Sequence, residues 1–330
     1  MVRADKGAVL VLPADGLIGG EPVRITLDRD GLVATTDGDR LAPTVGDWLD
    51  VEDDRALLIR ERRTALIRDT AGGPSRVQAL AANIDVVLVV EHLDPDPDLG
   101  RIERMLTLAW RSGAQPVVVL TKADLVPDPD GMAADVRAVA LAVDVHAVSV
   151  RDGTGLEPVR QLLRDGVTLV VVGPSGAGKS TLVNALAGRE VMDTGGQRND
   201  GRGRHTTTHR ELVPLAGGAV LIDTPGIRGV GLVADADALD TTFADVAALT
   251  QRCRFADCHH AGDAGCAIEA ALAEGELSER RFDSWRRLAK EAAYQARRSD
   301  ARLAAEDRAR WKQVTKEYQR GMRGPGRPRR

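Results

Sequence analysis

The stretch VTLVVVGPSGAGKST, residues 167–181, carries the strongest structural signal in the chain. It begins with a continuous apolar run, which is typical of a strand buried on both faces of a parallel sheet. GPSGAGKS then matches the pattern G-x-x-x-x-G-K-[ST], and LVNALAG after it predicts a helix. Strand, glycine-rich loop and helix in this order predict a phosphate-binding loop, in which backbone amides and the helix dipole hold phosphate oxygens.

Two side chains of this loop have predicted roles of their own. Lys179 can reach the β- and γ-phosphates of a nucleotide, and the Ser180 hydroxyl can ligate Mg²⁺. The predicted phosphate-side contacts are Gly173, Ser175, Gly176, Ala177, Gly178, Lys179, Ser180 and Thr181.

Other apolar runs alternate with helical segments on both sides of the loop. This alternation predicts a doubly wound α/β domain, to which we assign residues 81–238, with ligands at the carboxyl ends of its strands. The predicted strands are 84–90, 116–120, 143–149, 167–173 and 218–223, and helices are expected near 99–112, 131–142, 156–164 and 179–188.

A second motif, DTPG at residues 223–226, follows the last of these strands. The carboxylate of Asp223 would hold magnesium through water, and the Gly226 amide would sense the γ-phosphate. The four-residue pattern is weak by itself, but its place at a strand end behind a phosphate-binding loop makes it specific.

The base is predicted from TKAD at residues 121–124, which ends another buried run. The carboxylate of Asp124 can accept both N1–H and the N2 amine of guanine, whereas adenine offers an acceptor at N1 and no such amine. Guanine is therefore predicted, since a site built around such pairing rejects the wrong partner by roughly 10⁴–10⁵. Thr121 stands where such loops usually carry Asn, and it keeps a hydroxyl but loses the amide. Lys122 and Ser149, the latter after the next strand, complete the predicted GTP-binding set.

These motifs stand in an inverted order, because the base-reading loops at 121–124 and 149–150 precede the phosphate loop. A site assembled in space tolerates this order, since a closed cycle of βα units can be opened at a different point. We therefore predict a circularly permuted P-loop GTPase domain, an enzyme that converts GTP and water to GDP and phosphate.

Residues 1–80 predict a small β-barrel that is OB-like in size. Five short β-like runs, GAVLVL, EPVRITL, GLVATT, VGDWLDV and RALLIRE, are separated by turn signals such as DRDG and TDGD. Periodicity does not distinguish an OB barrel from an SH3-like one. Arginines near its end form either a face that tracks RNA phosphates or a solvated strand edge. They are Arg60, Arg62, Arg63, Arg68 and Arg76.

All three cysteines of the chain lie within residues 253–266 and predict a metal site rather than a disulfide framework. Three thiolates and one imidazole make the ligand set of a closed structural zinc site. The spacing leaves two histidines available. The predicted ligands are Cys253, Cys258, one of His259 and His260, and Cys266.

The C-terminal part, residues 239–330, is predicted to be an α-helical zinc-binding domain with a basic tail. Ala/Arg/Glu-rich helical sequence runs from 277 to about 319. Nine basic residues and one acid give the segment from Arg308 to Arg330 a charge of +8, so the rest of the chain, whose total is −4, carries −12. An acidic body with a basic tail indicates a polyanionic partner such as nucleic acid, and a solvated, disordered tail is the alternative.

The composition sets outer limits on the class of protein. A hydrophobic fraction of 43% suffices for cores packed from Val, Leu and Ala, which must dominate because aromatic residues make up only 3%. No uncharged apolar run approaches the ~18 residues of a membrane span, and the N-terminus shows no convincing signal-peptide cleavage site. The sequence therefore predicts a multidomain cytoplasmic protein without a membrane partner.

The order TKAD, phosphate loop, GRHTTT at 203–208, DTPG and Cys/His cluster resembles the ribosome small-subunit-dependent GTPase A family of circularly permuted bacterial GTPases. The resemblance extends over nearly the whole chain. It implies an N-terminal OB fold, one structural Zn²⁺ per chain with His260 as the imidazole ligand, and Mg²⁺ bound with GTP, with Thr207 completing its coordination. It further implies a GTPase that acts in late maturation of the small ribosomal subunit and whose hydrolysis that subunit stimulates. We also predict a monomer that contacts 16S rRNA and leaves the subunit upon GTP hydrolysis.

Hydrolysis requires a polar group other than the usual glutamine, because Ile227 follows Gly226 and an aliphatic side chain cannot orient water. His205 lies beside Thr206–Thr208 in a glycine-rich segment and is the predicted catalytic residue, a role that the resemblance supports. The alternative role for His205 is contact with RNA.

Two other functions compete with a GTPase whose cycle controls docking on the small subunit. One is an RNA-bound assembly factor in which GTP gates the conformation and turnover is incidental. The other is an ATP-using P-loop kinase, against which Asp124 argues.

Overall fold

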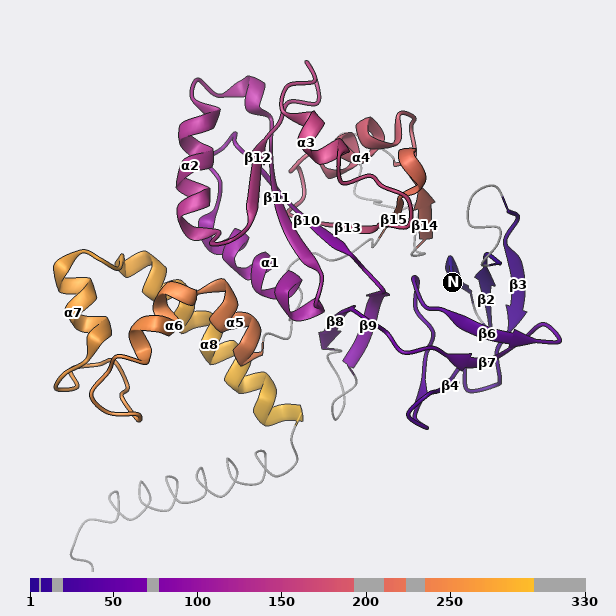
Figure 1. Cartoon of the computed structure of the whole chain (residues 1–330), viewed down its shortest axis with the longest axis horizontal. Coiled ribbons are helices and arrows are strands. Elements are labelled where there is room, and N and C mark those ends of the chain that lie inside the picture. Colours follow the sequence, from indigo (N-terminus) through magenta and orange to yellow (C-terminus); the bar gives the residue numbers. More distant parts are fainter. Residues whose placement is uncertain (6, 14–19, 70–76, 193–210, 224–234, 300–330) are drawn as a thin grey trace, which may run out of the picture.

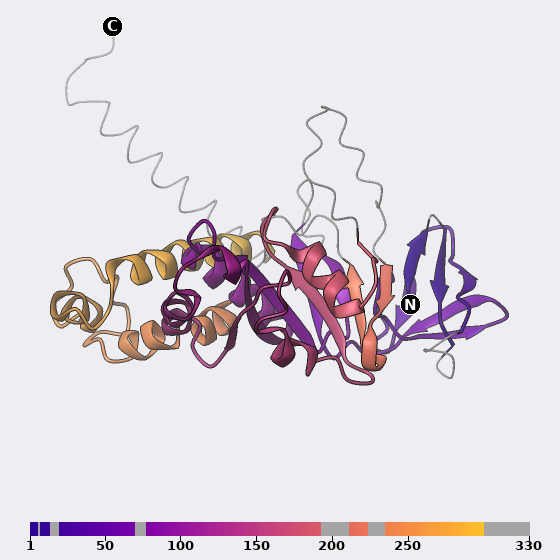
Figure 2. The ribbon, with the colours of Figure 1, turned by 90° about the horizontal axis from the view of Figure 1, so that it is seen from above.

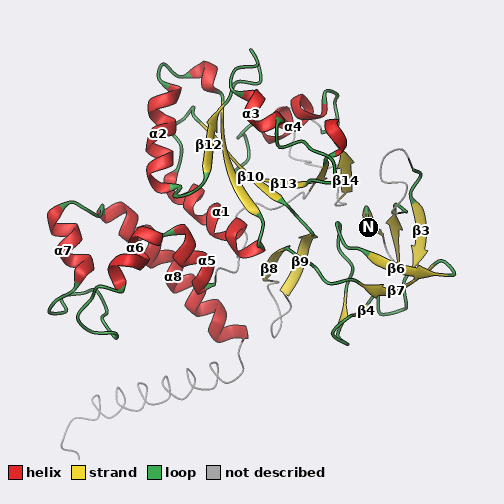
Figure 3. Ribbon diagram, viewed as in Figure 1, coloured by secondary structure: helices red, strands yellow, loops and turns green. Residues whose placement is uncertain are grey.

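The computed structural model describes residues 1–5, 7–13, 20–69, 77–192, 211–223 and 235–299 of the 330-residue chain. Short strands gather at one end of the molecule, a sheet flanked by helices lies in the middle, and helices gather at the other end (Figure 1, Figure 2). Figure 3 shows the same division by secondary structure. Within these ranges, no helix has the combined length and apolarity needed to span a membrane.

The middle of the molecule is a parallel sheet with one antiparallel edge. The order is β12-β11-β10-β13-β15-β14, and only β14 runs against its neighbour in this part of the sheet. Alternate residues enter two cores, with Val87 and Val89 on one face and Val86 and Leu88 on the other. The five parallel strands lie on the apolar runs predicted from the sequence. These five strands are β10 (Val86–His92), β11 (Gln115–Thr121), β12 (Asp144–Ala147), β13 (Thr168–Val172) and β15 (Val220–Asp223), and the antiparallel edge strand is β14 (Glu211–Pro214).

The helices of the middle part divide between the two faces of this sheet. One core contains residues of α1 (Leu99–Ser112) and α2 (Pro129–Val139), and the other contains residues of α3 (Leu156–Arg160) and α4 (Lys179–Ala187). Helix α1 has the bounds that the sequence predicts, because both ends are capped. The Asp98 carboxylate accepts a hydrogen bond from the Arg101 amide at the start, and Gly113 adopts φ 81° at the end.

The N-terminal strands are joined to the middle sheet by backbone pairing. Strand β1 lies beside β14, with Arg3 opposite Glu211, and the Leu212 amide donates to the Val2 carbonyl at 3.1 Å. The N-terminal and middle strands therefore form one continuous thirteen-stranded sheet within the described residues. The N-terminal strands are β1 (Arg3–Asp5), β2 (Ala8–Val11), β3 (Val23–Thr26), β4 (Val33–Thr35), β5 (Arg40–Leu41), β6 (Leu49–Glu52) and β7 (Arg55–Ile59).

A two-stranded hairpin of β8 (Ala65–Asp69) and β9 (Val77–Ala82) follows the N-terminal strands. The sequence did not predict it. Leu66 and Leu80 are buried in the core that also contains residues of α1. The hairpin therefore packs on the middle part, although it falls mostly within the segment assigned to the barrel.

The arginines near the end of the N-terminal part are neutralised where the structure describes them. Arg62 makes two hydrogen bonds, of 2.7 and 2.8 Å, to the fully buried carboxylate of Asp47. Arg60 pairs with Asp50 at 2.7 Å, and Arg63 lies 3.4 Å from an Asp85 oxygen. The side chain of Arg68 and all of Arg76 lie outside the described residues. The described arginines thus belong to ion pairs of the protein itself.

The C-terminal helices pack around a separate hydrophobic core, which includes Leu239, Phe243, Val246, Ile268 and Phe282. The last helix accounts for the predicted helical sequence up to residue 299, and the remainder, with the basic tail, lies outside the described residues. The helices are α5 (Ala236–Thr242), α6 (Ala244–Thr250), α7 (Ala267–Glu274) and α8 (Glu279–Ser299).

A buried ion-pair cluster attaches α8 to α1. The Glu103 carboxylate on α1 is inaccessible to solvent and accepts hydrogen bonds from Arg281 at 2.8 Å and from Arg280 at 2.9 Å. Arg281 is also buried and pairs with Asp245 of α6 at 2.9 Å. Each buried charge therefore has a partner of opposite sign, which buried charges require.

Removing one member of this cluster should destabilise the protein strongly. Arg281→Met leaves part of the Asp245 and Glu103 charge without its partner, and we expect the free energy of unfolding to fall by about 3 kcal/mol. Urea denaturation followed by circular dichroism measures the change. Arg286→Met, which breaks an exposed pair with Asp283 on the same helix, is the control and should cost less than about 1 kcal/mol. Equal losses in the two variants would contradict a structural role for the cluster.

Candidate nucleotide site and metal centre

The phosphate loop, residues 173–178, joins β13 to α4 at the carboxyl edge of the sheet. Gly173 lies so close to β10 that a Cβ atom there would overlap the Val90 carbonyl oxygen. The Lys179 ammonium group donates to the carbonyls of Gly173 and Pro174, at 2.9 and 2.6 Å. The Lys179 side chain therefore folds back onto the predicted phosphate loop and is hydrogen-bonded to its backbone.

The remaining phosphate-loop residues differ in their exposure. Ala177 is fully buried, and Gly178 begins α4 with φ 76°. The exposed members are Ser175, Gly176 and Thr181, while Ser180 is half-buried.

The base-reading loop begins at the last residue of β11. The Thr121 hydroxyl lies 2.7 Å from the Ala177 carbonyl oxygen of the phosphate loop and 3.2 Å from the Glu91 carbonyl oxygen of β10. Lys122 adopts φ 63° and donates to the Asp94 carbonyl at 3.2 Å. Asp124 keeps 19% of its side chain exposed, so its carboxylate remains accessible to a ligand.

Ser149 lies in a tight turn after β12 and is 1% exposed. Its amide donates to the Thr154 carbonyl at 2.9 Å, and its hydroxyl accepts from the Asp152 amide at 3.4 Å. The Thr154 backbone amide also lowers the pKa of Asp152. The turn is joined to the base-reading loop, because the Ala123 amide donates to Val148 at 3.1 Å.

The sheet order brings the predicted motifs together despite their inverted sequence. Strands β11, β10 and β13 are parallel neighbours, so the loops after β11 and β13 leave the same edge of the sheet, separated only by β10. A hydrogen bond from the Thr121 hydroxyl to the Ala177 carbonyl joins the two loops directly. The loops predicted to read the base and to bind phosphate therefore lie beside each other at one edge of the sheet.

Asp223 ends β15 at this edge and lies opposite Glu211 of β14. Partial burial, and next the negative charge of Glu211, raise the pKa of the Asp223 carboxyl. A partly buried carboxylate beside a second acidic residue suits a bound divalent cation. The other predicted switch residues, His205, Thr207 and Gly226, lie outside the described residues.

Two charged groups near the site were missed by the sequence analysis. Glu91, at the end of β10, is fully buried and makes a two-point ion pair with Arg101 of α1, at 2.7 and 3.1 Å. Arg151 approaches Asp124 to 4.0 Å. Glu91 could have been noticed in the sequence because it is an acidic residue at the end of an apolar strand. No local feature of the sequence identifies Arg151 as a neighbour of Asp124.

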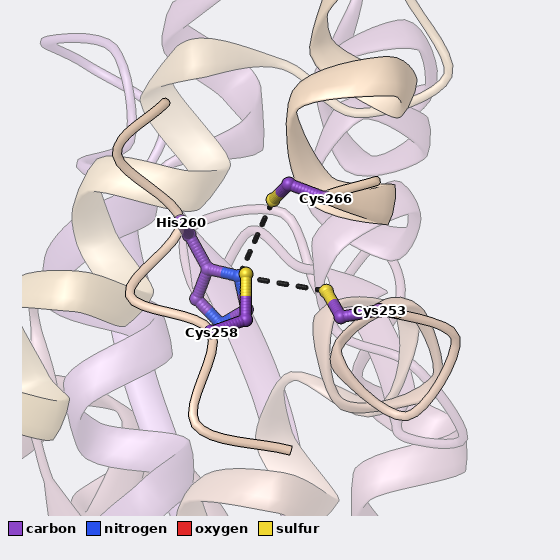
Figure 4. A group of neighbouring side chains, drawn as sticks. All are labelled: Cys253, Cys258, His260 and Cys266. Atoms are coloured by element: carbon purple, nitrogen blue, oxygen red, sulfur yellow. Dashed lines mark hydrogen bonds between the residues drawn. The ribbon is translucent and has the colours of Figure 1, made fainter. Parts of the chain in front are cut away.

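The four predicted metal ligands meet in the C-terminal part. The thiol groups of Cys253, Cys258 and Cys266 and a ring nitrogen of His260 all lie within 4.8 Å of one another (Figure 4). His260 Nδ1 lies 3.6 Å from Cys253 Sγ and 3.5 Å from Cys266 Sγ. His259 is exposed and is not part of this group. The donor set of three sulfurs and one nitrogen could hold a metal ion.

The electrostatics of the thiols favour binding of a cation. Burial raises the pKa of Cys258 to about 12. Burial also acts on Cys253 and would raise its pKa, but hydrogen bonds from the backbone amides of Ala267 and Ile268 at the start of α7 and from Cys258 and Cys266 together outweigh it and lower the pKa of that thiol. Deprotonation of Cys258 is therefore unfavourable without a cation, and a bound metal ion would stabilise its thiolate.

Adding a side chain at Gly173 should disable the phosphate loop. Gly173→Ala forces the loop away from the Val90 carbonyl, and we expect affinity for a nucleoside triphosphate to fall at least about tenfold. Equilibrium binding of a fluorescent nucleotide measures this. Gly188→Ala is the control, because Gly188 also has positive φ but has open space around it. It should cost about 1 kcal/mol of stability and leave affinity unchanged; wild-type affinity in Gly173→Ala would refute the close contact.

The metal centre predicts a difference between adjacent histidines. His260→Ala should lose stoichiometric Zn²⁺ binding and unfold the C-terminal helices, whereas His259→Ala should retain both properties. Metal content by atomic absorption and the fluorescence of Trp285, whose ring lies 6.1 Å from that of His260, report the two effects. Equal zinc content in the two variants would exclude His260 as a ligand.

Comparisons with known proteins agree with this geometry. A family model described as RsgA GTPase matches residues 59–233. The chain is 46% identical over 328 residues to the small ribosomal subunit biogenesis GTPase RsgA of Streptomyces coelicolor, covering 97% of this chain and 85% of that protein. It is 42% identical over 276 residues to the small ribosomal subunit biogenesis GTPase RsgA 1 of Listeria innocua, covering 83% and 79%.

Solved structures share the fold at lower sequence identity. YjeQ from Thermotoga maritima superposes with a TM-score of 0.62 at 23% identity, covering 88% of this chain and 96% of that one. YloQ, a circularly permuted GTPase, gives 0.60 at 22% identity, covering 89% and 94%. The chain therefore belongs to the RsgA GTPase family and is a circularly permuted, GTP-hydrolysing enzyme.

Proposed function

We propose that this GTPase acts in the late maturation of the small ribosomal subunit, in the cytoplasm, and that GTP hydrolysis drives its release from the subunit. The proposal requires that the protein bind GTP. The single observation that supports a guanine-nucleotide site is the meeting of the 121–124 and 173–178 loops at one edge of the sheet. The ribosomal part is supported by the names of relatives that match 97% of this chain.

The two loops divide the work of nucleotide binding. Asp124 accepts the two adjacent donors of guanine, while Lys122 and Ser149 support the base from either side. Phosphate oxygens lie on the backbone amides of the loop and on Lys179, whose ammonium exchanges its present carbonyl partners for the β- and γ-phosphates. Thr121 belongs to the base-reading loop without contacting the nucleotide, and the proposed nucleotide contacts are Lys122, Asp124, Ser149, Gly173, Ser175, Gly176, Ala177, Gly178, Lys179, Ser180, Thr181, Asp223 and Gly226.

Magnesium fits the phosphate end of the site. Ser180 offers a hydroxyl, Asp223 a carboxylate with raised pKa, and Thr207 is the proposed third protein group. When bound, Mg²⁺ supplies charge stabilisation to the phosphates during transfer. Zn²⁺ fits the Cys253–Cys266 group, where four protein ligands leave no position for substrate, so its role is structural.

Hydrolysis is assigned to His205 as the group that orients the attacking water. Ile227 follows Gly226 and has no polar atom to offer. A partner that fixes the segment around His205 would accelerate the reaction, which accounts for stimulation by the small subunit.

The proposed division of the chain follows its three functions. Residues 1–80 form an OB-like RNA-binding part, 81–238 the permuted GTPase domain, and 239–330 the zinc-binding helical part. Because the described arginines between 60 and 63 are paired within the protein, the basic tail is the stronger electrostatic contact with 16S rRNA. We propose a monomer on the subunit.

Turnover with and without purified small subunits tests the proposal. Subunits should stimulate hydrolysis of GTP but not of ATP, and higher salt should weaken the effect because phosphate contacts are screened. His205→Ala should lose ~10²–10⁴ of the stimulated rate while GTP affinity is unchanged. His209→Ala, at the other histidine of the same segment, is the matched control.

Three results would overturn parts of this function. Equal turnover with and without subunits contradicts stimulation, and equal affinity for ATP and GTP contradicts guanine reading. If subunit maturation in cells survives complete loss of hydrolysis in His205→Ala, the protein acts as a GTP-gated assembly factor instead.

A further inference from the structure

Thr121 has an environment that does not suit a residue in contact with the base. Its side chain is 3% exposed and is enclosed by the end of β10 and by the phosphate loop. A Cβ atom at Gly178 would lie 3.4 Å from the Thr121 hydroxyl oxygen and 3.6 Å from its Cβ. The threonine therefore fills the space between the two halves of the site.

The Thr121 hydroxyl forms its hydrogen bonds with backbone carbonyl groups of the protein. A threonine hydroxyl has one hydrogen to donate, and both of its neighbours, the carbonyl oxygens of Ala177 and Glu91, only accept. The distance of 2.7 Å to Ala177 against 3.2 Å to Glu91 directs the hydrogen to the phosphate loop. No hydrogen remains for a nucleotide.

The backbone of Thr121 is fixed as well. Its carbonyl accepts a hydrogen bond from the Leu93 amide at 3.0 Å, and two residues later the Ala123 amide is held by Val148 at 3.1 Å. The segment that carries Asp124 is therefore anchored on both sides. A change in the separation of the two loops must act on the hydrogen bond between Thr121 and Ala177.

We propose that Thr121 is a positioning residue that latches the base-reading loop to the phosphate loop and sets the distance between Asp124 and Lys179. It contributes to nucleotide affinity by holding both halves in the bound arrangement before the ligand arrives. It does not select the base. This inference rests on the proposed guanine site and assigns Thr121 a role within it.

Substitutions that keep or remove the hydroxyl test the latch. Thr121→Val preserves the shape and removes the donor, and we expect affinity for both GTP and ITP, which lacks the 2-amino group, to fall about tenfold. Thr121→Ser keeps the donor and should restore affinity to within about twofold of wild type. Because Thr121 does not read the base, the ratio of GTP to ITP affinity should stay at the wild-type value in both variants.

Two further variants calibrate the measurement, which is equilibrium binding with the full-length protein. Asp124→Ala removes the acceptor of the 2-amino group and should bring the ratio of GTP to ITP affinity close to one. Thr107→Val removes another buried hydroxyl, bonded to the Glu103 carbonyl at 2.9 Å in α1. It should lower the melting temperature, as Thr121→Val does, without changing nucleotide affinity.

Each outcome decides between defined alternatives. Wild-type affinity in Thr121→Val refutes the latch, and so does a loss in Thr121→Ser as large as that in Thr121→Val. A changed ratio of GTP to ITP affinity in Thr121→Val means that the residue reads the base. If the wild-type protein itself shows no preference for GTP over ITP and ATP, the proposed guanine site fails, which is distinct from failure of the latch.

Discussion

The site depends on a close backbone contact between the phosphate loop and the ends of two neighbouring strands. Gly173 lies against the Val90 carbonyl without room for a side chain, and the Thr121 hydroxyl reaches Ala177 across the end of β10. These contacts require β11, β10 and β13 to be adjacent and parallel, but they place no condition on the order of the strands in the chain. This is the physical reason why a permuted sequence can form an intact nucleotide site.

Helix α1 connects this site to the C-terminal part. Near its start, Arg101 pairs with the buried Glu91, whose own carbonyl lies beside the Thr121 hydroxyl. In the same helix turn, Glu103 is enclosed by Arg280 and Arg281 of α8. The part that carries the Cys/His group is thus attached, through charges that are costly to separate, to a helix that begins near the carboxyl edge of the sheet. The C-terminal helices are therefore held to the middle part by these ion pairs as well as by the chain connection that follows Asp223.

The N-terminal part is attached by a different kind of contact. Strand β1 extends the sheet beside β14, which begins directly after the segment that contains His205. Backbone pairing and the packing of the β8–β9 hairpin hold this part, while its described arginines are engaged with Asp47, Asp50 and Asp85. Its surface charge is therefore lower than its arginine content suggests, because the fold brings aspartates from distant positions to the arginines that would otherwise form a phosphate-tracking face.

The sequence by itself determined the features that depend on neighbouring residues. The bounds of α1 follow from Asp98 and Gly113, the phosphate loop follows from its glycines, and the Cys/His ligands follow from a spacing of a few residues. Only the tertiary structure decided the contacts between distant segments, such as where the Thr121 hydroxyl points and how Glu103 meets Arg281, 178 residues away. Such partners have no signal in sequence because almost any surface arginine can pair with almost any acid. Burial in the folded chain selects one pair and makes it obligatory.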